Sequence, residues 1–363
     1  MLVVKDIHIL HVLPQLVNGG MELSLARVAN SPQLRQMRHT IIVIRGKNTI
    51  PHRLPEHLKI YCLHSRPKEV LLPVRLGRLI RQLKPDVIHA RNWGAWPDSA
   101  FARLLAPGVP LIYSFHGLSD PHEPLRRRMM APLLARATTR IFTVSKSARQ
   151  SLAGNLCMKT SRIGVIPNGV DTMRFCPNPA RKAAARIVIG AVGNLTPVKN
   201  HTLLIDVCAG LIKQGLDIEL RIAGNGVLWK SLNEKVLSLG LVDNIKMLGQ
   251  VDDVAPFLKD LDIFALPSLS EANPNALLEA MASGLPCVAA KVGGVDELLD
   301  HPNCGINFPA GNADQLKQAI TLLVGDPEKR SQLGTAARAR VCNEYSMDLM
   351  ARAYEHLYRG LAR

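Results

Sequence analysis

The alternation of short apolar runs with longer helical segments constrains the fold of this chain more than any other feature. Strand-like runs recur along the whole sequence, and helical patterns lie between them. The runs occupy residues 7–13, 39–44, 59–62, 86–89, 111–114, 140–144, 163–166, 187–195, 218–223, 245–248, 263–266 and 286–289. Such alternation predicts an α/β protein with doubly wound parallel sheets, whose ligands bind at the carboxyl ends of the strands.

Chain length and one proline-containing segment predict two domains. A chain of 363 residues is long enough for two domains of ordinary size. Residues 176–186 contain two prolines and several basic side chains, as expected of a linker. We expect a first domain over residues 1–175, a second over 176–345, and a last helix over 346–363.

The composition is that of a soluble globular protein, with 47% apolar and 20% charged residues. Aromatic residues make up only 4%, which argues against a base-stacking surface for single-stranded nucleic acid. The seven cysteines are scattered and never spaced as CxxC, so they fit a reducing cytosol and no metal site. No apolar run is long enough to span a bilayer, and the first residues are typical of a buried strand rather than a signal peptide.

The positive charge is concentrated in the first half of the chain. Residues 1–180 carry 26 Lys and Arg against 9 Asp and Glu, a balance of +17, whereas residues 181–363 have a balance of −1. This asymmetry indicates that the first half faces a polyanion, which could be nucleic acid, a lipid surface or a phosphorylated substrate.

Two helical segments of the first half are both basic and apolar. In residues 124–140, Arg126, Arg127 and Arg128 stand beside Met and Leu residues, as in helices that lie on an anionic membrane. The alternative is a crossover helix with solvated arginines, and the sequence favours neither interpretation. For residues 74–84 the crossover interpretation is favoured. We expect the three arginines to form a membrane or acceptor patch.

The segment 261–284 has the pattern strand, loop, helix. Its apolar start predicts a buried strand, Asn273 is a suitable helix cap, Pro274 suits the first helical position, and Gly284 suits the position just past the helix. A helix N-terminus is thereby directed to the carboxyl edge of a sheet, where anions bind.

Two acids bracket this helix N-terminus. Glu271 lies in the loop and Glu279 lies within the helix. The amides of residues 275–277 (Asn275, Ala276 and Leu277) could meet a phosphate, with one carboxylate taking sugar hydroxyls and the other taking ribose hydroxyls. The alternative is that Glu271 only caps the helix and Glu279 is an exposed acid; geometry alone leaves both open.

Two further features follow predicted strands of the first half. Gly19 and Gly20 stand between a strand and a helix, which allows close approach of a phosphate. They do not form a GxGxxG fingerprint, and the chain has no Walker-type GK[ST] sequence. His116 follows the strand at residues 111–114; a single histidine there more often has a structural role than a functional one.

Five segments in a fixed order resemble the retaining, nucleotide-sugar-dependent glycosyltransferases of family 4. They are NGGMELSLA (18–26), IPNGVDTMRF (166–175), GNLTPVKNHTLLIDV (193–207), AGNG (223–226) and SEANPNALLEAMASGLPCVAAKVGGVDEL (270–298). The last segment is the most specific, because Glu271 and Glu279 match the family's Glu-x7-Glu motif. The resemblance spans nearly the whole chain and implies the GT-B fold: two Rossmann-like domains, an interdomain cleft, and a last helix that crosses back to the first domain.

The resemblance also implies roles for individual residues. The donor diphosphate would be approached by Gly19 and Gly20 and neutralised by Lys199, and the cleft would hold His116 on its acceptor side. The other donor contacts would come from Glu271 to the transferred sugar, from Glu279 to the ribose, and from the backbone near Gly249 and Val251 to the base. The catalytic residues are then His116, Lys199 and Glu271.

One position departs from the family pattern. Many relatives carry an arginine as a second diphosphate cation where this chain has Asn194 and Thr196. Either Lys199 and backbone amides are sufficient, or Arg91 or Arg174 substitutes. A binding protein that has lost activity would also fit, although the intact pair of glutamates argues against it. No paired-carboxylate metal motif occurs, since the adjacent Asp252 and Asp253 are more simply an acidic turn.

We therefore expect a cytoplasmic, metal-independent hexosyltransferase that takes a nucleoside-diphosphate sugar as co-substrate and needs no cofactor. Its acceptor would be a glycan or lipid-linked glycan of cell-surface polysaccharide synthesis, and the protein could bind the inner face of the cytoplasmic membrane peripherally. No nucleic acid partner is expected. The alternatives are a nucleotide-sugar epimerase of the same fold and a non-catalytic protein with a basic binding surface.

Overall fold

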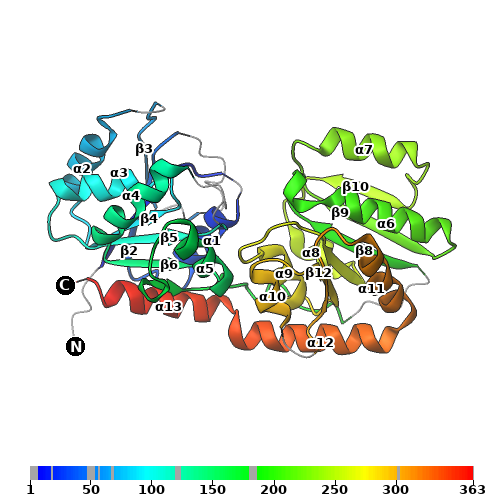
Figure 1. Ribbon diagram of the computed structural model, residues 1–363. Helices are drawn as coiled ribbons and strands as arrows, with labels where there is room; N and C mark the ends of the chain where they lie inside the picture. The colour runs from blue at the N-terminus through cyan, green and yellow to red at the C-terminus, as the bar shows by residue number, and fades with distance from the viewer. Residues whose placement is uncertain are drawn as a thin grey trace. The chain divides into compact units, whose positions relative to one another are not determined.

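The computed structural model describes residues 7–17, 19–46, 54–55, 58–66, 69–118, 124–179, 186–300 and 303–362. The chain forms two compact units (Figure 1). The first comprises Met1–Gly169 with Met347–Arg363, and the second comprises Val170–Ser346. Each unit has one parallel sheet with helices packed against it, so the expected α/β architecture is confirmed.

The first unit has a parallel sheet with the strand order β3-β2-β1-β4-β5-β6-β7. Its strands are β1 (His8–Leu13), β2 (Arg38–Val43), β3 (Lys59–Cys62), β4 (Val87–Arg91), β5 (Leu111–Phe115), β6 (Arg140–Thr143) and β7 (Ile163–Val165). Its helices are α1 (Gly20–Asn30), α2 (Leu72–Leu83), α3 (Trp96–Ala102), α4 (Leu125–Arg136), α5 (Lys146–Asn155) and α13 (Met347–Arg359), with short 3-10 turns at Arg103–Leu105 and Thr160–Arg162. The strand order reverses between β1 and β4, which places a ligand crevice at their carboxyl ends.

The second unit repeats this plan with the order β10-β9-β8-β11-β12-β13. Its strands are β8 (Ile187–Val192), β9 (Ile218–Ala223), β10 (Ile245–Gly249), β11 (Ile263–Leu266), β12 (Cys287–Ala290) and β13 (Ile306–Phe308). Its helices are α6 (His201–Lys213), α7 (Trp229–Ser238), α8 (Val254–Lys259), α9 (Asn275–Ala282), α10 (Gly294–Leu299), α11 (Ala313–Gly325) and α12 (Pro327–Glu344), with a 3-10 turn at Pro197–Lys199. The order reverses between β8 and β11, so a ligand is expected to bind at the carboxyl ends of those strands.

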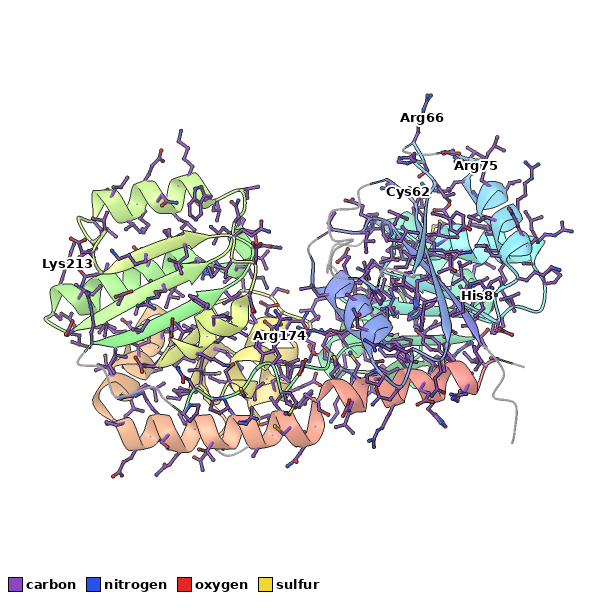
Figure 2. The ribbon with its side chains drawn as sticks, turned by 180° about the vertical axis from the view of Figure 1, so that it is seen from behind. His8, Cys62, Arg66, Arg75, Arg174 and Lys213 are labelled. Carbon is purple, nitrogen blue, oxygen red and sulfur yellow. The ribbon has the colours of Figure 1, made fainter. Side chains whose placement is uncertain are left out.

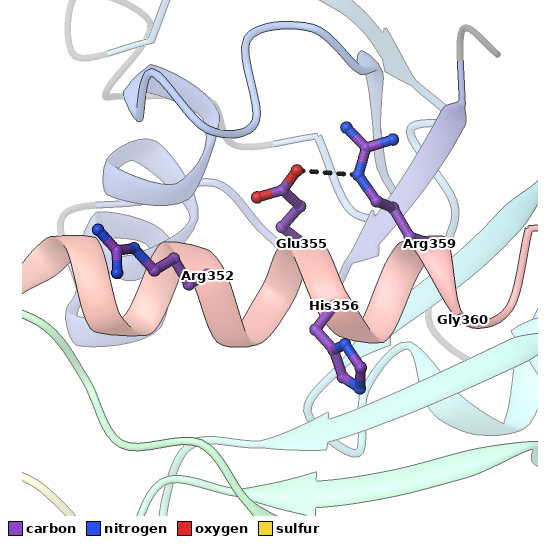
Figure 3. A pocket seen from close by; sticks show the side chains of 5 residues that line it. All are labelled: Arg352, Glu355, His356, Arg359 and Gly360. Carbon is purple, nitrogen blue, oxygen red and sulfur yellow. Dashed lines mark hydrogen bonds and ion pairs between the residues drawn. The ribbon is translucent and has the colours of Figure 1, made fainter. Parts of the chain in front are cut away.

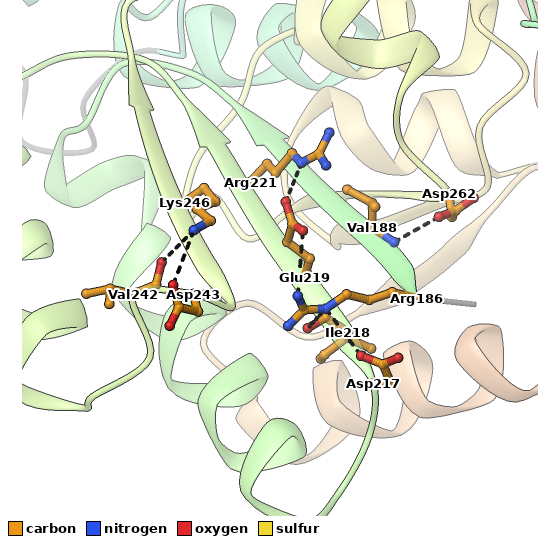
Figure 4. Close-up of polar contacts among 10 residues, drawn as sticks. All are labelled: Arg186, Val188, Asp217, Ile218, Glu219, Arg221, Val242, Asp243, Lys246 and Asp262. Atoms are coloured by element: carbon orange, nitrogen blue, oxygen red, sulfur yellow. Dashed lines mark hydrogen bonds and ion pairs between the residues drawn. The ribbon is translucent and has the colours of Figure 1, made fainter. Parts of the chain in front are cut away.

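An aspartate ties the two central strands of each sheet together at their amino ends. In the first sheet the backbone N–H of His8 (labelled in Figure 2) donates to Asp86 at 2.9 Å, and in the second the N–H of Val188 donates to Asp262 at 2.8 Å. Around this second contact, ion pairs join Arg186 to Asp217 and Glu219 (Figure 4). The amino edge is thus closed by structural contacts, and the carboxyl edge is left to the loops.

The division between the units lies after Gly169. Residues 170–175, expected in the first domain, belong to the second unit, because the N–H of Val170 donates to the Tyr345 carbonyl at 2.9 Å and Phe175 packs in the second unit's core. The last helix, α13, belongs to the first unit, where it lies along the sheet (Figure 1). Its buried residues Met350, Tyr354 and Tyr358 pack in one cluster with residues of β1, β4 and β6.

Candidate active site

The loop and helix that follow β11 have nearly the predicted form. β11 is fully buried, as its apolar run predicts. The helix cap, however, is Pro274 and not Asn273, because the backbone of Pro274 is still extended at ψ 116° and the helix starts at Asn275. Gly284 follows the C-cap Ser283 with φ +73°, as expected for a glycine past a helix end. The predicted start is therefore wrong by one residue.

Lys199 and Glu271 meet at the carboxyl edge of the second sheet. Nζ of Lys199 donates to Oε1 of Glu271 at 2.5 Å, and the Ser268 hydroxyl donates to the same oxygen at 2.8 Å. The N–H of Leu269 donates to the Val198 carbonyl at 2.7 Å, so the loops that follow β8 and β11 are joined. Because β8 and β11 are neighbours in the sheet, these two residues come together although they are distant in sequence.

Both glutamates of the predicted motif are buried. Glu271 and Glu279 are each 8% exposed. A buried carboxylate is unfavourable unless it has partners, so the interpretation of Glu279 as an exposed helix acid does not hold. The loop after β11 and helix α9 each contribute one buried carboxyl group, and that of Glu271 is paired with Lys199.

Glycines allow the neighbouring loops to pack backbone against backbone. Gly224 has φ +152°, and a Cβ at this position would overlap the Gly193 carbonyl oxygen; a Cβ on Gly226 would stand 2.5 Å from the Leu195 carbonyl oxygen. The N–H of Gly224 also donates to the Gly249 carbonyl at 2.7 Å. Gly249 thus lies at the carboxyl edge of the sheet, where the resemblance places the base of the donor, and the nearby Val251 packs against the core of this unit.

His201, which the sequence analysis did not assign, lies beside Lys199. It is 2% exposed, and neither ring nitrogen has a hydrogen-bond partner among the residues that the structure describes. Burial, reinforced by the nearby Lys199, lowers its pKa to about 4, so the imidazole is neutral at physiological pH. Its position at the start of a helix gave no sequence signal of this burial.

The first unit contains a pocket of about 520 Å³ at the crevice between β1 and β4. It is lined by Gly20, Met21, Glu22, Asn92, Phe115, His116, Gly117, Leu118 and Arg127. The pocket brings together three predicted residues, Gly20, His116 and Arg127, and adds Glu22 and Asn92, to which no role was assigned. Asn92 has φ +60°, a conformation that asparagine tolerates better than most residues but that the sequence alone does not reveal.

Glu22 folds back over the start of α1. A Cβ on Gly19, the residue before this helix, would stand 2.5 Å from Oε2 of Glu22. Burial raises the pKa of Glu22, and the positive charge of Arg91 acts in the opposite direction. The glycine therefore makes room for a carboxyl group at the pocket.

His116 is held on three sides. Its backbone N–H donates to Oδ1 of Asn92 at 2.9 Å. Its ring Nε2 lies 3.0 Å from the Ser114 hydroxyl and 3.3 Å from Nη1 of Arg91. Burial, together with the charge of Arg91, lowers the pKa of His116 well below its usual value. The imidazole is therefore neutral and is not available as a cation.

The two arginines considered as substitute phosphate cations are engaged elsewhere. Arg91 is fully buried, with its guanidinium 5.7 Å from the ring centre of Tyr354. Arg174 pairs with Asp253 at 2.8 Å, and this partly exposed contact lowers the pKa of Asp253, which also caps α8. These placements favour neither arginine as the substitute cation, and they give Asp253 the structural role expected of an acidic turn.

The three arginines of α4 do not share one face. Arg127 lines the pocket and lies over the ring of Trp93 at 5.4 Å, whereas Arg126 and Arg128 are exposed. A second pocket, of about 440 Å³, is formed on α13 by Arg352, Glu355, His356, Arg359 and Gly360 (Figure 3). Its residues come from α13 and from Gly360, which directly follows that helix, and Arg359 is already paired with Glu355 at 2.8 Å. We therefore take two candidate sites, one in each unit: the 520 Å³ pocket of the first unit and the carboxyl edge of the second sheet.

Two sequence families match the chain. The family described as glycosyltransferase family 4 matches residues 18–174, and the family described as glycosyl transferases group 1 matches residues 177–340. The two matches together cover most of the sequence. The chain belongs to the family 4 glycosyltransferases.

Three known proteins show how far this similarity extends. EpsF of Bacillus subtilis is 34% identical over 185 residues, and the match spans 48% of this chain and about half (47%) of that protein's length. The UDP-Gal:alpha-D-GlcNAc-diphosphoundecaprenol alpha-1,3-galactosyltransferase of Escherichia coli is 26% identical over 279 residues, 71% of each protein. The crystal structure of Anabaena HepE in complex with UDP-glucose superposes with a TM-score of 0.83 at 21% identity, covering 97% of this chain and 99% of that one. The expected GT-B fold is thus confirmed.

In this glycosyltransferase the loop after β8 carries a single cation, Lys199. Asn194 is exposed and Thr196 is half-buried, and the N–H of Lys199 donates to the Thr196 carbonyl at 3.0 Å. Asn194 and Thr196, which stand where many relatives have an arginine, therefore belong to the turn that leads to Lys199. Among the described residues, no group of three His, Cys, Asp or Glu side chains is arranged to hold a metal ion.

Proposed function

We propose that this enzyme transfers a hexose, with retention of configuration, from a nucleoside-diphosphate sugar to a glycan or lipid-linked glycan acceptor. The contact between Lys199 and Glu271 carries the proposal, because a cation and a carboxylate meet at the carboxyl edge of the second sheet, where they would face the diphosphate and the sugar of the donor. Glu279, buried within α9, would receive the ribose hydroxyls, and the amides at the start of this helix would face the diphosphate.

The chemistry follows from the charge that develops during transfer. The acceptor oxygen forms a bond to the anomeric carbon, the bond from that carbon to the diphosphate breaks, and negative charge grows on the leaving group. Lys199, with backbone amides of α9 and of Gly19 and Gly20, would stabilise this charge. In a front-face displacement the acceptor proton passes to an oxygen of the leaving diphosphate, so a neutral His116 would orient the substrates rather than act as a base.

Two relatives indicate the substrate classes. HepE was crystallised with UDP-glucose, and the name of the Escherichia coli relative specifies UDP-galactose and a diphosphoundecaprenol-linked acceptor. A uridine diphosphate hexose and a lipid-linked glycan are therefore the first substrates to test. Synthesis of a cell-surface polysaccharide is the process that would consume such a product.

The decisive experiment screens nucleoside-diphosphate sugars for protection of the protein against thermal unfolding. A donor at 100 times its dissociation constant adds about 2.7 kcal/mol to the unfolding free energy. The donor that protects is then incubated with and without acceptor. Conversion of the sugar without acceptor would indicate an epimerase, and failure of every UDP, GDP, ADP and dTDP sugar to protect would overturn the proposal.

We expect transfer to proceed without a divalent cation. In the proposed mechanism Lys199 and backbone amides would stabilise the charge of the diphosphate, so no metal would have to supply that stabilisation. Turnover measured in excess EDTA should equal turnover in Mg²⁺. Loss of activity in EDTA that Mg²⁺ or Mn²⁺ restores would show that the prediction is wrong.

A face of α4 supports the expected membrane contact. Leu125, Met129 and Leu133 recur every four residues and are 70%, 71% and 59% exposed, with exposed Arg126 and Arg128 on the same helix. An outward apolar stripe beside arginines suits an anionic bilayer surface. No helix in the described part of the chain is long and apolar enough to cross a membrane.

The membrane contact predicts that replacing Arg126 and Arg128 by Ser weakens binding to anionic liposomes about tenfold or more, since each basic residue contributes about 1 kcal/mol. Sedimentation with phosphatidylglycerol vesicles measures this. The control replaces Arg78 and Arg81 of α2 by Ser, which removes the same charge from another exposed helix. Equal weakening by both pairs, or no binding by the unaltered protein, would argue against a specific role of α4.

A further inference from the structure

A chain of hydrogen-bonded side chains crosses the interior of the first unit and ends at His116. The Tyr358 hydroxyl of α13 lies 2.8 Å from Nδ1 of His89, and Nε2 of His89 lies 2.8 Å from the Ser114 hydroxyl. The Ser114 hydroxyl lies 3.0 Å from Nε2 of His116. Tyr358, His89 and Ser114 are fully buried, and His116 lines the pocket.

Arg91 determines which ring nitrogen of His116 accepts a hydrogen bond. Its Nη1 lies 3.3 Å from Nε2 of His116, and a guanidinium can only donate. Nε2 must therefore be the acceptor. Because the imidazole is also neutral, its single proton lies on Nδ1. Within the described residues this Nδ1 has no hydrogen-bond partner.

The other protons of the chain follow from this assignment. If the Ser114 hydroxyl donates to Nε2 of His116, its oxygen can accept from His89, whose Nδ1 then accepts from Tyr358. Each of the three hydrogen-bonded pairs of side chains then shares one proton. The opposite direction would leave two acceptors, the Ser114 oxygen and Nε2 of His116, facing each other at 3.0 Å.

The protonation states of Tyr358 and His89 suit this direction of hydrogen-bond donation. Burial raises the pKa of Tyr358, so its hydroxyl keeps its proton and can donate. Burial and the charge of Arg91 lower the pKa of His89 well below its usual value, so this ring is neutral and carries one proton. Arg91 itself is fully buried, so its charge acts strongly on the imidazoles around it.

We propose that Arg91 and the Tyr358–His89–Ser114 chain are positioning residues that hold His116 as a neutral imidazole with its proton on Nδ1, so that it serves as a fixed hydrogen-bond donor for a ligand oxygen and not as a base. The last helix thereby acts on the pocket through Tyr358. The inference rests on the proposed function only for the claim that His116 contributes to transfer.

The form of His116 can be tested without substrate. The protein labelled with ¹⁵N-histidine is examined by long-range ¹H–¹⁵N correlation between pH 6 and pH 8, with His116 assigned from His116→Gln. We expect one neutral form with the proton on Nδ1 across this range. A protonated ring, or a proton on Nε2, would overturn the inference whatever the enzyme transfers.

Two variants that each remove one hydroxyl test the chain. Tyr358→Phe and Ser114→Ala should each lower turnover about threefold to tenfold, the value of one hydrogen bond, with little change in the donor KM. If Tyr358 acts through Ser114, the double variant should be no worse than Ser114→Ala alone. Additive losses would contradict the connection.

The matched control is Tyr354→Phe, because Tyr354 lies on the same helix and contacts the same His89 through its ring, with centroids 6.1 Å apart. Its turnover should not change. Arg91→Met should allow the Nε2-protonated form of His116 to appear in the spectrum. Arg91→Lys, which keeps a cation, should retain the form with the proton on Nδ1. If the Arg91 variants do not fold, the hydroxyl variants still decide the question. An enzyme inactive with every donor would overturn the proposed function but leave the spectrum of His116 to be judged by itself.

Discussion

Replacement of Glu271 by Gln, or of Lys199 by Ala, is expected to lower turnover about a hundredfold or more while the protein remains folded. Each change removes a charged group from the ion pair between Lys199 and Glu271 at the proposed donor site, where Nζ and Oε1 are 2.5 Å apart. Lys199→Ala would remove the cation that faces the leaving diphosphate. Glu271→Gln would remove the anion that accepts the sugar hydroxyls. Turnover is measured with the donor that protects against unfolding, and folding by circular dichroism.

The stability of the same variants separates structure from catalysis. Lys199→Ala removes the cation beside Glu271, which is 8% exposed, and leaves Oε1 with the Ser268 hydroxyl as its hydrogen-bond partner among the described residues. This variant should therefore unfold more easily than the double variant that also carries Glu271→Gln. The double variant should stay inactive. Glu234→Gln serves as the control, because Glu234 pairs with Lys230 at an exposed position of α7. Near-normal turnover in either single variant would remove that residue from the mechanism.

The sequence was sufficient to predict most helices and strands, because the patterns that indicate them are local. Runs of β-branched residues gave most strands of both sheets within a residue or two, and the helix after β11 was displaced by one residue only. The strand β13 was missed because its three residues, Ile-Asn-Phe, have a polar residue in the middle and do not form an apolar run. Strand order depends on how distant segments pair, so neither the central position of β1 nor that of β8 follows from any local pattern.

The candidate site was predictable to the extent that family motifs carry it. Glu271 and Lys199 were found through their motifs, and their contact follows from the pairing of β8 with β11, which the sequence does not show. Arg91 was one of two arginines considered as a substitute phosphate cation, but its guanidinium lies over the ring of Tyr354 of α13, which comes at the end of the chain. The burial of His201 and the left-handed backbone of Asn92 also depend on tertiary packing, and no sequence signal was available for them.

Replacement of Gly224 by Ala is expected to have the largest effect on stability, a loss of about 3 kcal/mol or more. Gly224 has φ +152°, and its added Cβ would overlap the backbone carbonyl oxygen of Gly193, which no side-chain movement can relieve. The loop that must shift leads directly to Lys199. We therefore expect donor affinity to fall as well, measured by titration calorimetry beside urea unfolding.

The control for this substitution is Gly215→Ala. Gly215 also has a positive φ, +92°, but a Cβ there would have no atom within 4 Å. Its cost is therefore the backbone conformation alone, about 1–2 kcal/mol, with donor affinity unchanged. If Gly224→Ala were no less stable than Gly215→Ala and bound donor equally well, the close packing of the Gly193 and Gly224 loops would not be needed to position Lys199.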